Sequence, residues 1–88
     1  MSEVMQAVRE IISDVCDIPL EEIQPGVHLL RELGVDSVDF LDVVHDIDRK
    51  YDIALPVESW ANAVSRGEPD TTYFVLDRLV ENIESLRS

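Results

Sequence analysis

Ser37 is the side chain in this sequence whose surroundings most favour a chemical role. It follows Gly34-Val35-Asp36 and precedes an amphipathic segment, so we expect it in the first turn of a helix. Ser and Asp are frequent helix caps, and a cap alone would explain Ser37 or Asp36. The amino end of a helix also stabilises an attached anionic group such as phosphate, and Gly34 leaves room for a modifying enzyme. Both interpretations stay open on these residues.

A catalytic serine would need a general base, and the chain has only two histidines, His28 and His45. His45 follows Ser37 by eight residues on the same expected helix, about 12 Å along its axis, which is beyond hydrogen-bonding distance. His28 falls in a loop whose position the sequence does not fix. The chain is also small for a deep substrate pocket. We therefore expect no enzyme activity.

Metal sites are not expected either. Cys16 and the two histidines lack the paired spacing of a zinc site. Residues 46–52 begin like a calcium loop, but Lys50 fills a ligand position and Tyr51 stands where the turn requires glycine. Cys16 is the only cysteine, so no internal disulfide is expected.

The chain is strongly acidic, with 19 Asp and Glu against 7 Lys and Arg and a net charge of −12. This charge repels nucleic acids and anionic membrane surfaces and favours partners with basic patches. A hydrophobic content of 45% is ordinary for a folded domain. We see no secretion signal and no apolar run of about 20 residues, so we expect a cytoplasmic protein without stable membrane insertion.

Apolar residues recur at helical spacing in four stretches, and none shows the alternation of a strand. The expected helices span about 2–16, 37–51, 57–65 and 70–86. Ser2 can cap the first, and Asp70 or Thr71 can cap the last. The sequence predicts an all-α fold: a small four-helix bundle with three long helices, one shorter helix and a long first loop. We expect one freestanding, monomeric domain, residues 1–88.

The faces of these helices are also predicted. The loop over 17–35 carries apolar anchors and a short turn near Leu20 to Ile23. The second helix has an apolar face and, opposite it, a column of carboxylates: Asp39, Asp42 and Asp46. One side of the third helix is expected to carry Trp60, Ala61 and Val64. The buried stripe of the last helix is expected to hold Phe74, Leu76, Leu79, Val80, Ile83 and Leu86.

Residues 33–39, Leu-Gly-Val-Asp-Ser-Val-Asp, resemble the signature around the phosphopantetheine serine of acyl carrier proteins. The resemblance includes Ile23-Gln24-Pro25 and Ile53-Ala54-Leu55-Pro56 and covers essentially the whole chain. It implies a carrier, not an enzyme. Ser37 would carry 4′-phosphopantetheine, added from coenzyme A by a magnesium-dependent phosphopantetheinyl transferase. Acyl groups would be attached as thioesters to the terminal thiol of this arm.

The resemblance also assigns two surfaces. A docking set would meet basic patches on the transferase, on fatty acid synthesis and elongation enzymes, and on acyltransferases: Asp36, Val38, Asp39, Asp42 and Asp46. A shelter set would cover the acyl chain: Phe40, Leu41, Val44, Trp60 and Val64. A solvated face and plain core packing are the respective alternatives.

Three features depart from typical members of the family. Val38 stands where leucine is usual, and Arg49-Lys50 stands where acidic residues are usual. The segment 60–76 is longer than usual. Trp60, the glycine near the turn and Tyr-Phe-Val-Leu in the last helix resemble specialised carriers of very-long-chain hydroxylated fatty acids for lipid A in some Gram-negative bacteria. A carrier of polyketide, aminoacyl or ordinary fatty acyl groups, and an acidic helical adaptor without a prosthetic group, remain alternatives.

Overall fold

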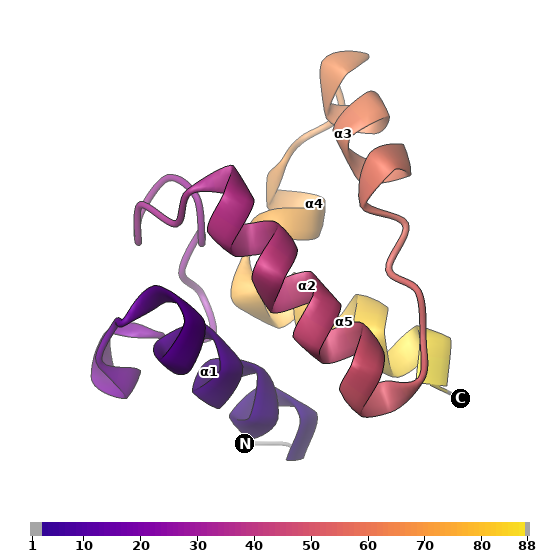
Figure 1. Cartoon of the computed structure of the whole chain (residues 1–88). Coiled ribbons are helices and arrows are strands. Elements are labelled where there is room, and N and C mark those ends of the chain that lie inside the picture. Colours follow the sequence, from indigo (N-terminus) through magenta and orange to yellow (C-terminus); the bar gives the residue numbers. More distant parts are fainter. Residues whose placement is uncertain (1–2, 88) are drawn as a thin grey trace.

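The computed structural model describes residues 3–87, and its regular elements are helices (Figure 1). In chain order they are α1 (Glu3–Cys16), the 3-10 helix η1 (Leu20–Glu22), α2 (Ser37–Tyr51), α3 (Val57–Ser65), α4 (Thr71–Phe74) and α5 (Leu76–Arg87). Across this described range there is no β-strand, only an isolated antiparallel bridge between His28 and Val75. The all-α prediction is confirmed. The expected cap Ser2 lies outside the described residues.

The hydrophobic core lies where α1, α2 and α5 meet (Figure 1). Its most deeply buried side chains come from these helices and from the first loop: Val8, Ile12, Ile23, Leu29, Val43, Val44, Ile47, Leu76, Leu79 and Ile83. Burying an aliphatic side chain of this kind stabilises a fold by about 1.5–3 kcal/mol. By contrast, α3 projects away from the three long helices and buries only Trp60 and Ala63. No helix among residues 3–87 is long and apolar enough to cross a membrane.

Helix α2 has the predicted bounds, and both of its ends are capped. The Asp36 carboxylate accepts a hydrogen bond of 3.1 Å from the backbone N–H of Val38, so Asp36 is the amino cap. At the other end Asp52 adopts a left-handed conformation with φ 53°, and its N–H donates to the Asp48 carbonyl. These caps fix the first turn of α2 and therefore the position of Ser37.

The first loop is tied to the rest of the fold by polar contacts. Helix η1 lies at the predicted short turn, and the Arg9 guanidinium donates to the carbonyls of Leu20 and Ile23, each at 2.7 Å. Further along, the loop exchanges backbone hydrogen bonds with the segment around Val75. Leu29 N–H donates to the Phe74 carbonyl at 2.9 Å, and Leu76 N–H donates to the Val27 carbonyl at 3.0 Å.

Two sequence predictions about the last helix are wrong. The expected continuous helix is divided, because Val75 is extended (φ −83°, ψ 134°) between α4 and α5. The hydrogen bonds between the first loop and the segment around Val75 stabilise this break. Leu86, predicted to be buried, is 46% exposed in the last turn of α5.

The predicted face of α3 is also partly wrong. Ala61 is exposed, whereas Ala63 is buried and Val64 is half-buried. Trp60 and Ala63 lie three positions apart and therefore share one face of the helix. That face turns inward and leaves Ala61 at the surface between α3 and α2.

Candidate functional site

Ser37 presents an exposed hydroxyl in the first turn of α2. Because Asp36 supplies the cap, the Ser37 side chain is not needed for it, and it makes no hydrogen bond to another residue in the range 3–87. Gly34, just before, has φ +70°, and beyond its two chain neighbours no heavy atom lies within 4 Å of the position where a Cβ would stand. The hydroxyl is therefore accessible to an enzyme, on a helix end that favours a negative charge.

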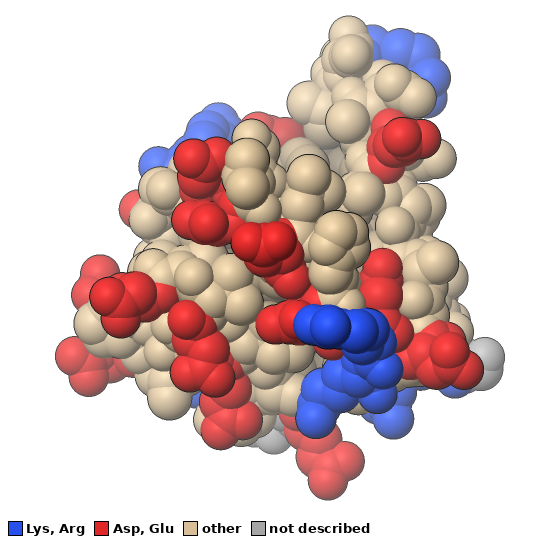
Figure 2. Space-filling model, viewed as in Figure 1, with Lys and Arg blue, Asp and Glu red and all other residues tan. Residues whose placement is uncertain are grey.

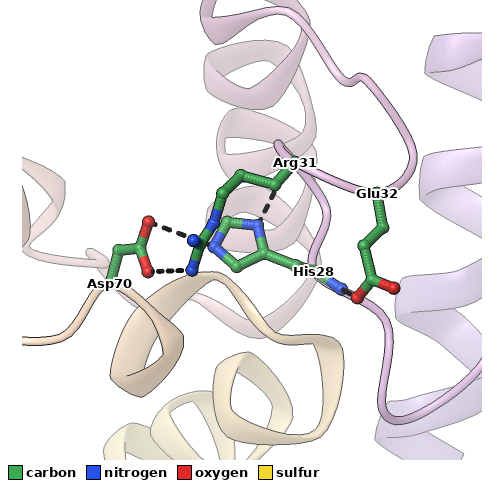
Figure 3. A network of polar contacts seen from close by, with 4 residues as sticks. All are labelled: His28, Arg31, Glu32 and Asp70. Atoms are coloured by element: carbon green, nitrogen blue, oxygen red, sulfur yellow. Dashed lines mark hydrogen bonds and ion pairs between the residues drawn. The ribbon is translucent and has the colours of Figure 1, made fainter.

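His28 is not placed as a base for Ser37, and His45 lies eight residues along α2 from it. His28 is only 4% exposed and belongs to a network with Arg31, Glu32 and Asp70 (Figure 3). Its Nδ1 accepts from the backbone N–H of Arg31 at 3.1 Å, its own backbone N–H donates to Glu32 Oε1 at 2.8 Å, and its Nε2 lies 3.3 Å from Asp70 Oδ2. The last contact lacks the alignment of a hydrogen bond. His28 is thus engaged in joining the first loop to the start of α4.

A cavity of about 280 Å³ opens beside Ser37, between α2 and α3. Its lining is mostly apolar: Leu30, Phe40, Leu41, Val57, Ala61 and Phe74. Ser37 and Glu58 complete it. An apolar hollow that begins at an exposed hydroxyl can shelter an apolar chain attached there, at about 0.8 kcal/mol for each methylene removed from water.

The predicted shelter set only partly coincides with this cavity. Phe40 and Leu41 line it, whereas Val44 lines a neighbouring hollow of about 440 Å³. Trp60 is buried and stacks on Tyr73, with ring centroids 5.3 Å apart. Val64 is half-buried and lines neither hollow.

The docking set lies along α2, but its residues differ in how exposed they are and in whether they form ion pairs. Asp36 and Asp42 are exposed, while Asp39 and Asp46 are half-buried, and Asp46 is ion-paired with Arg49. Figure 2 shows acidic side chains crossing this face until they meet a group of Lys and Arg side chains. Two apolar side chains, Val38 and Leu41, stand 64% and 44% exposed beside the carboxylates. This face can therefore offer both charge and apolar contact to a partner.

The Cys16 thiol is not a second attachment point of comparable reactivity. Burial raises its pKa, and the nearby carboxylates of Asp39 and Asp42 raise it further. The reactive thiolate is therefore scarce at neutral pH. Within the described part of the chain, moreover, no three His, Cys, Asp or Glu side chains gather into a set that could hold a metal ion.

Comparison with known proteins decides among the classes that this geometry allows. Residues 6–62 match the sequence family described as the phosphopantetheine attachment site. The chain belongs to the acyl carrier proteins. It is 42% identical over 82 residues to acyl carrier protein AcpXL of Rhizobium meliloti, covering 92% of this chain and 86% of that protein. It is 39% identical over 87 residues to AcpXL of Mesorhizobium japonicum, covering 98% and 94%. An acyl carrier protein of Phenylobacterium zucineum is 28% identical over 79 residues, covering 90% and 98%.

This acyl carrier protein therefore carries acyl groups on 4′-phosphopantetheine, and its residues fit that group. The exposed Ser37 hydroxyl, the helix end around it and the open space at Gly34 suit a bulky phosphate-linked arm. Five residues that line the cavity were not predicted as site residues from the sequence: Leu30, Val57, Glu58, Ala61 and Phe74. Val57, Ala61 and Phe74 lie in segments with helical patterns, but which of their faces would border α2 depends on how α3 and α4 pack.

Proposed function

We propose that Ser37 is the residue that carries the arm and that a phosphopantetheinyl transferase attaches it. The supporting observation is that Asp36, not Ser37, caps α2, so the hydroxyl is exposed and has no structural partner among residues 3–87. In this step the Ser37 hydroxyl loses its proton to solvent and its oxygen forms a bond to the phosphorus of coenzyme A nearest the pantetheine. The bond from that phosphorus to the bridging diphosphate oxygen breaks, and adenosine 3′,5′-bisphosphate leaves with that oxygen. When bound, the arm supplies a terminal thiol that holds acyl groups as thioesters.

We further propose that the enzymes of fatty acid synthesis and elongation dock on α2. Val38 and Asp42 are the exposed centre of the docking set and can meet a basic, partly apolar patch. Asp46 contributes less, because Arg49 already pairs with it. A flexible arm raises the local concentration of the tethered substrate for each docked enzyme, so the contacts themselves can stay weak and transient.

For the cargo, we propose very-long-chain fatty acids destined for lipid A. The similarity to proteins named AcpXL, at 42% and 39% identity, supports this, since the ordinary acyl carrier protein of Phenylobacterium zucineum shares only 28%. The match to the Mesorhizobium japonicum protein covers 98% of this chain, so it includes the lengthened segment 60–76. On this proposal residues 1–88 form one monomeric carrier domain that works in the cytoplasm with elongation enzymes and one acyltransferase.

The cargo is tested by purifying the protein from its host and identifying the thioester-bound chains by mass spectrometry. Very-long-chain acyl groups on the wild-type protein, and none on Ser37→Ala, are expected. Chains of medium length only, or polyketide or aminoacyl groups, would refute the cargo. Acylation of Ser37→Ala would refute the attachment site.

A further inference from the structure

Phe74 stands at the centre of an aromatic cluster that joins four parts of the chain. Its ring meets Phe40 of α2 edge-on, with centroids 5.4 Å apart and an interplanar angle of 81°. It also meets Trp60 of α3 at 6.5 Å, its neighbour Tyr73 at 6.3 Å and the imidazole of His28 at 6.2 Å. A ring with contacts on so many sides has one preferred position.

The backbone of Phe74 is fixed as well. Its carbonyl accepts the hydrogen bond from Leu29 N–H at 2.9 Å, and the extended Val75 follows it. The Phe74 side chain is thus held at the point where α4 ends, against the buried rings of Trp60 and His28. It also lines the cavity beside Ser37. Phe74 therefore forms the wall between this cavity and the interior of the protein.

We propose that Phe74 determines how much of a tethered acyl chain the protein shelters. The cavity of about 280 Å³ has room for about ten methylene groups at the density of a protein interior. Further carbons would have to displace the Phe74 ring from its aromatic contacts or stay outside. A longer cargo is therefore sheltered only in part, and its remainder stays available to the enzyme that acts on it. This inference rests on the proposed attachment of the arm to Ser37.

The test loads the holo protein with saturated acyl groups of about 4 to about 16 carbons and measures the melting temperature of each product. For the wild type we expect a rise up to about ten carbons and then a plateau, because only sheltered methylenes stabilise the fold. Phe74→Ala should move the plateau about four carbons longer, and Phe74→Leu should move it less. Ala61→Leu, which adds volume at an exposed cavity-lining position, should bring the plateau to shorter chains.

Tyr73→Ala is the matched control, because Tyr73 belongs to the same aromatic cluster but does not line the cavity. It should lower every melting temperature and leave the plateau in place. The proposal is overturned if neither Phe74→Leu nor Ala61→Leu moves the plateau. It is also overturned if Tyr73→Ala moves the plateau as far as these variants do. Both outcomes can be judged even if Phe74→Ala fails to fold. So does a wild-type melting temperature that is independent of chain length. Absence of the arm from the wild type, seen by mass before any melting, would instead refute Ser37 as the attachment site.

Discussion

The imidazole of His28 in the first loop contacts the carboxylate of Asp70 just before α4, with His28 Nε2 3.3 Å from Asp70 Oδ2 (Figure 3). Because Nδ1 of His28 accepts a hydrogen bond from the Arg31 N–H, the neutral ring carries its hydrogen on Nε2, beside the carboxylate. Arg31 reaches the other Asp70 oxygen at 2.6 Å. The contact joins the first loop to the segment that leads into α4.

Removing the Asp70 carboxylate should destabilise the protein through this buried imidazole. Asp70→Ala removes the carboxylate 3.3 Å from the buried Nε2 of His28, which makes no hydrogen bond in the wild type, so only this electrostatic contact is lost there and we expect the free energy of unfolding to fall by about 0.5–1.5 kcal/mol. Arg31→Ala removes only the exposed ion pair between Arg31 and Asp70 and should lower the free energy of unfolding by about 0–1 kcal/mol. Urea unfolding of both variants compares them. Equal losses would show that the buried contact contributes nothing.

The cap of α2 should depend on Asp36 and not on Ser37. Asp36→Ala removes the acceptor for the Val38 N–H and should cost about 1 kcal/mol, or about 4–8 °C in melting temperature for a domain of this size. Asp36→Ser should recover most of the loss, since serine also caps helices. Ser37→Ala is the control, and the apo variant should melt like the wild type. A large loss in Ser37→Ala would mean that the serine has a structural role.

Neighbouring carboxylates of α2 should differ in their effect on partner binding. Asp42→Asn should slow association with the phosphopantetheinyl transferase several-fold at low salt, because the charge is exposed and unpaired among the described residues. Asp46→Asn should have less effect, since Arg49 already compensates its charge. Stopped-flow association rates across a salt series measure this, with Glu84→Gln on α5 as a control of equal charge change. An equal slowing in all three variants would indicate a general charge effect instead of a docking surface.

Cys16 should react slowly with alkylating reagents. Burial, Asp39 and Asp42 all raise the pKa of its thiol, so at any given pH less thiolate is present than in a free cysteine. The rate of iodoacetamide labelling of the apo protein should therefore rise at higher pH than for glutathione. In Asp39→Asn the rise should move toward lower pH, because one repelling charge is gone. Labelling as fast as glutathione at pH 8 would disagree with this placement of Cys16.

Local patterns in the sequence were sufficient to predict the bounds of several elements of the fold. The bounds of α2 and α3 follow from a capping aspartate, from Pro56 before α3 and from regular apolar spacing. The turn η1 follows from prolines and apolar anchors in the loop. In each case the residues that decide the structure are neighbours in sequence.

Features that depend on distant partners were not predictable in this way. Val75 has neither a glycine nor a proline beside it, and the break there exists because Val27 and Leu29 bond to the backbone on either side of it. Likewise, nothing near His28 in sequence shows that Asp70 will lie beside it. The composition of the cavity depends on the same long-range packing, so the local pattern around Phe74 predicts a buried stripe and does not place this residue in the site.

Intact-mass spectrometry can show whether the Ser37 hydroxyl carries the arm. The apo protein is incubated with coenzyme A, Mg²⁺ and a broad-specificity phosphopantetheinyl transferase. We predict that the wild type gains the mass of one phosphopantetheine group, that Asp36→Ser also gains it, and that Ser37→Ala gains none. A wild-type protein that gains no mass, or a Ser37→Ala variant that is modified, would rule out Ser37 as the attachment site.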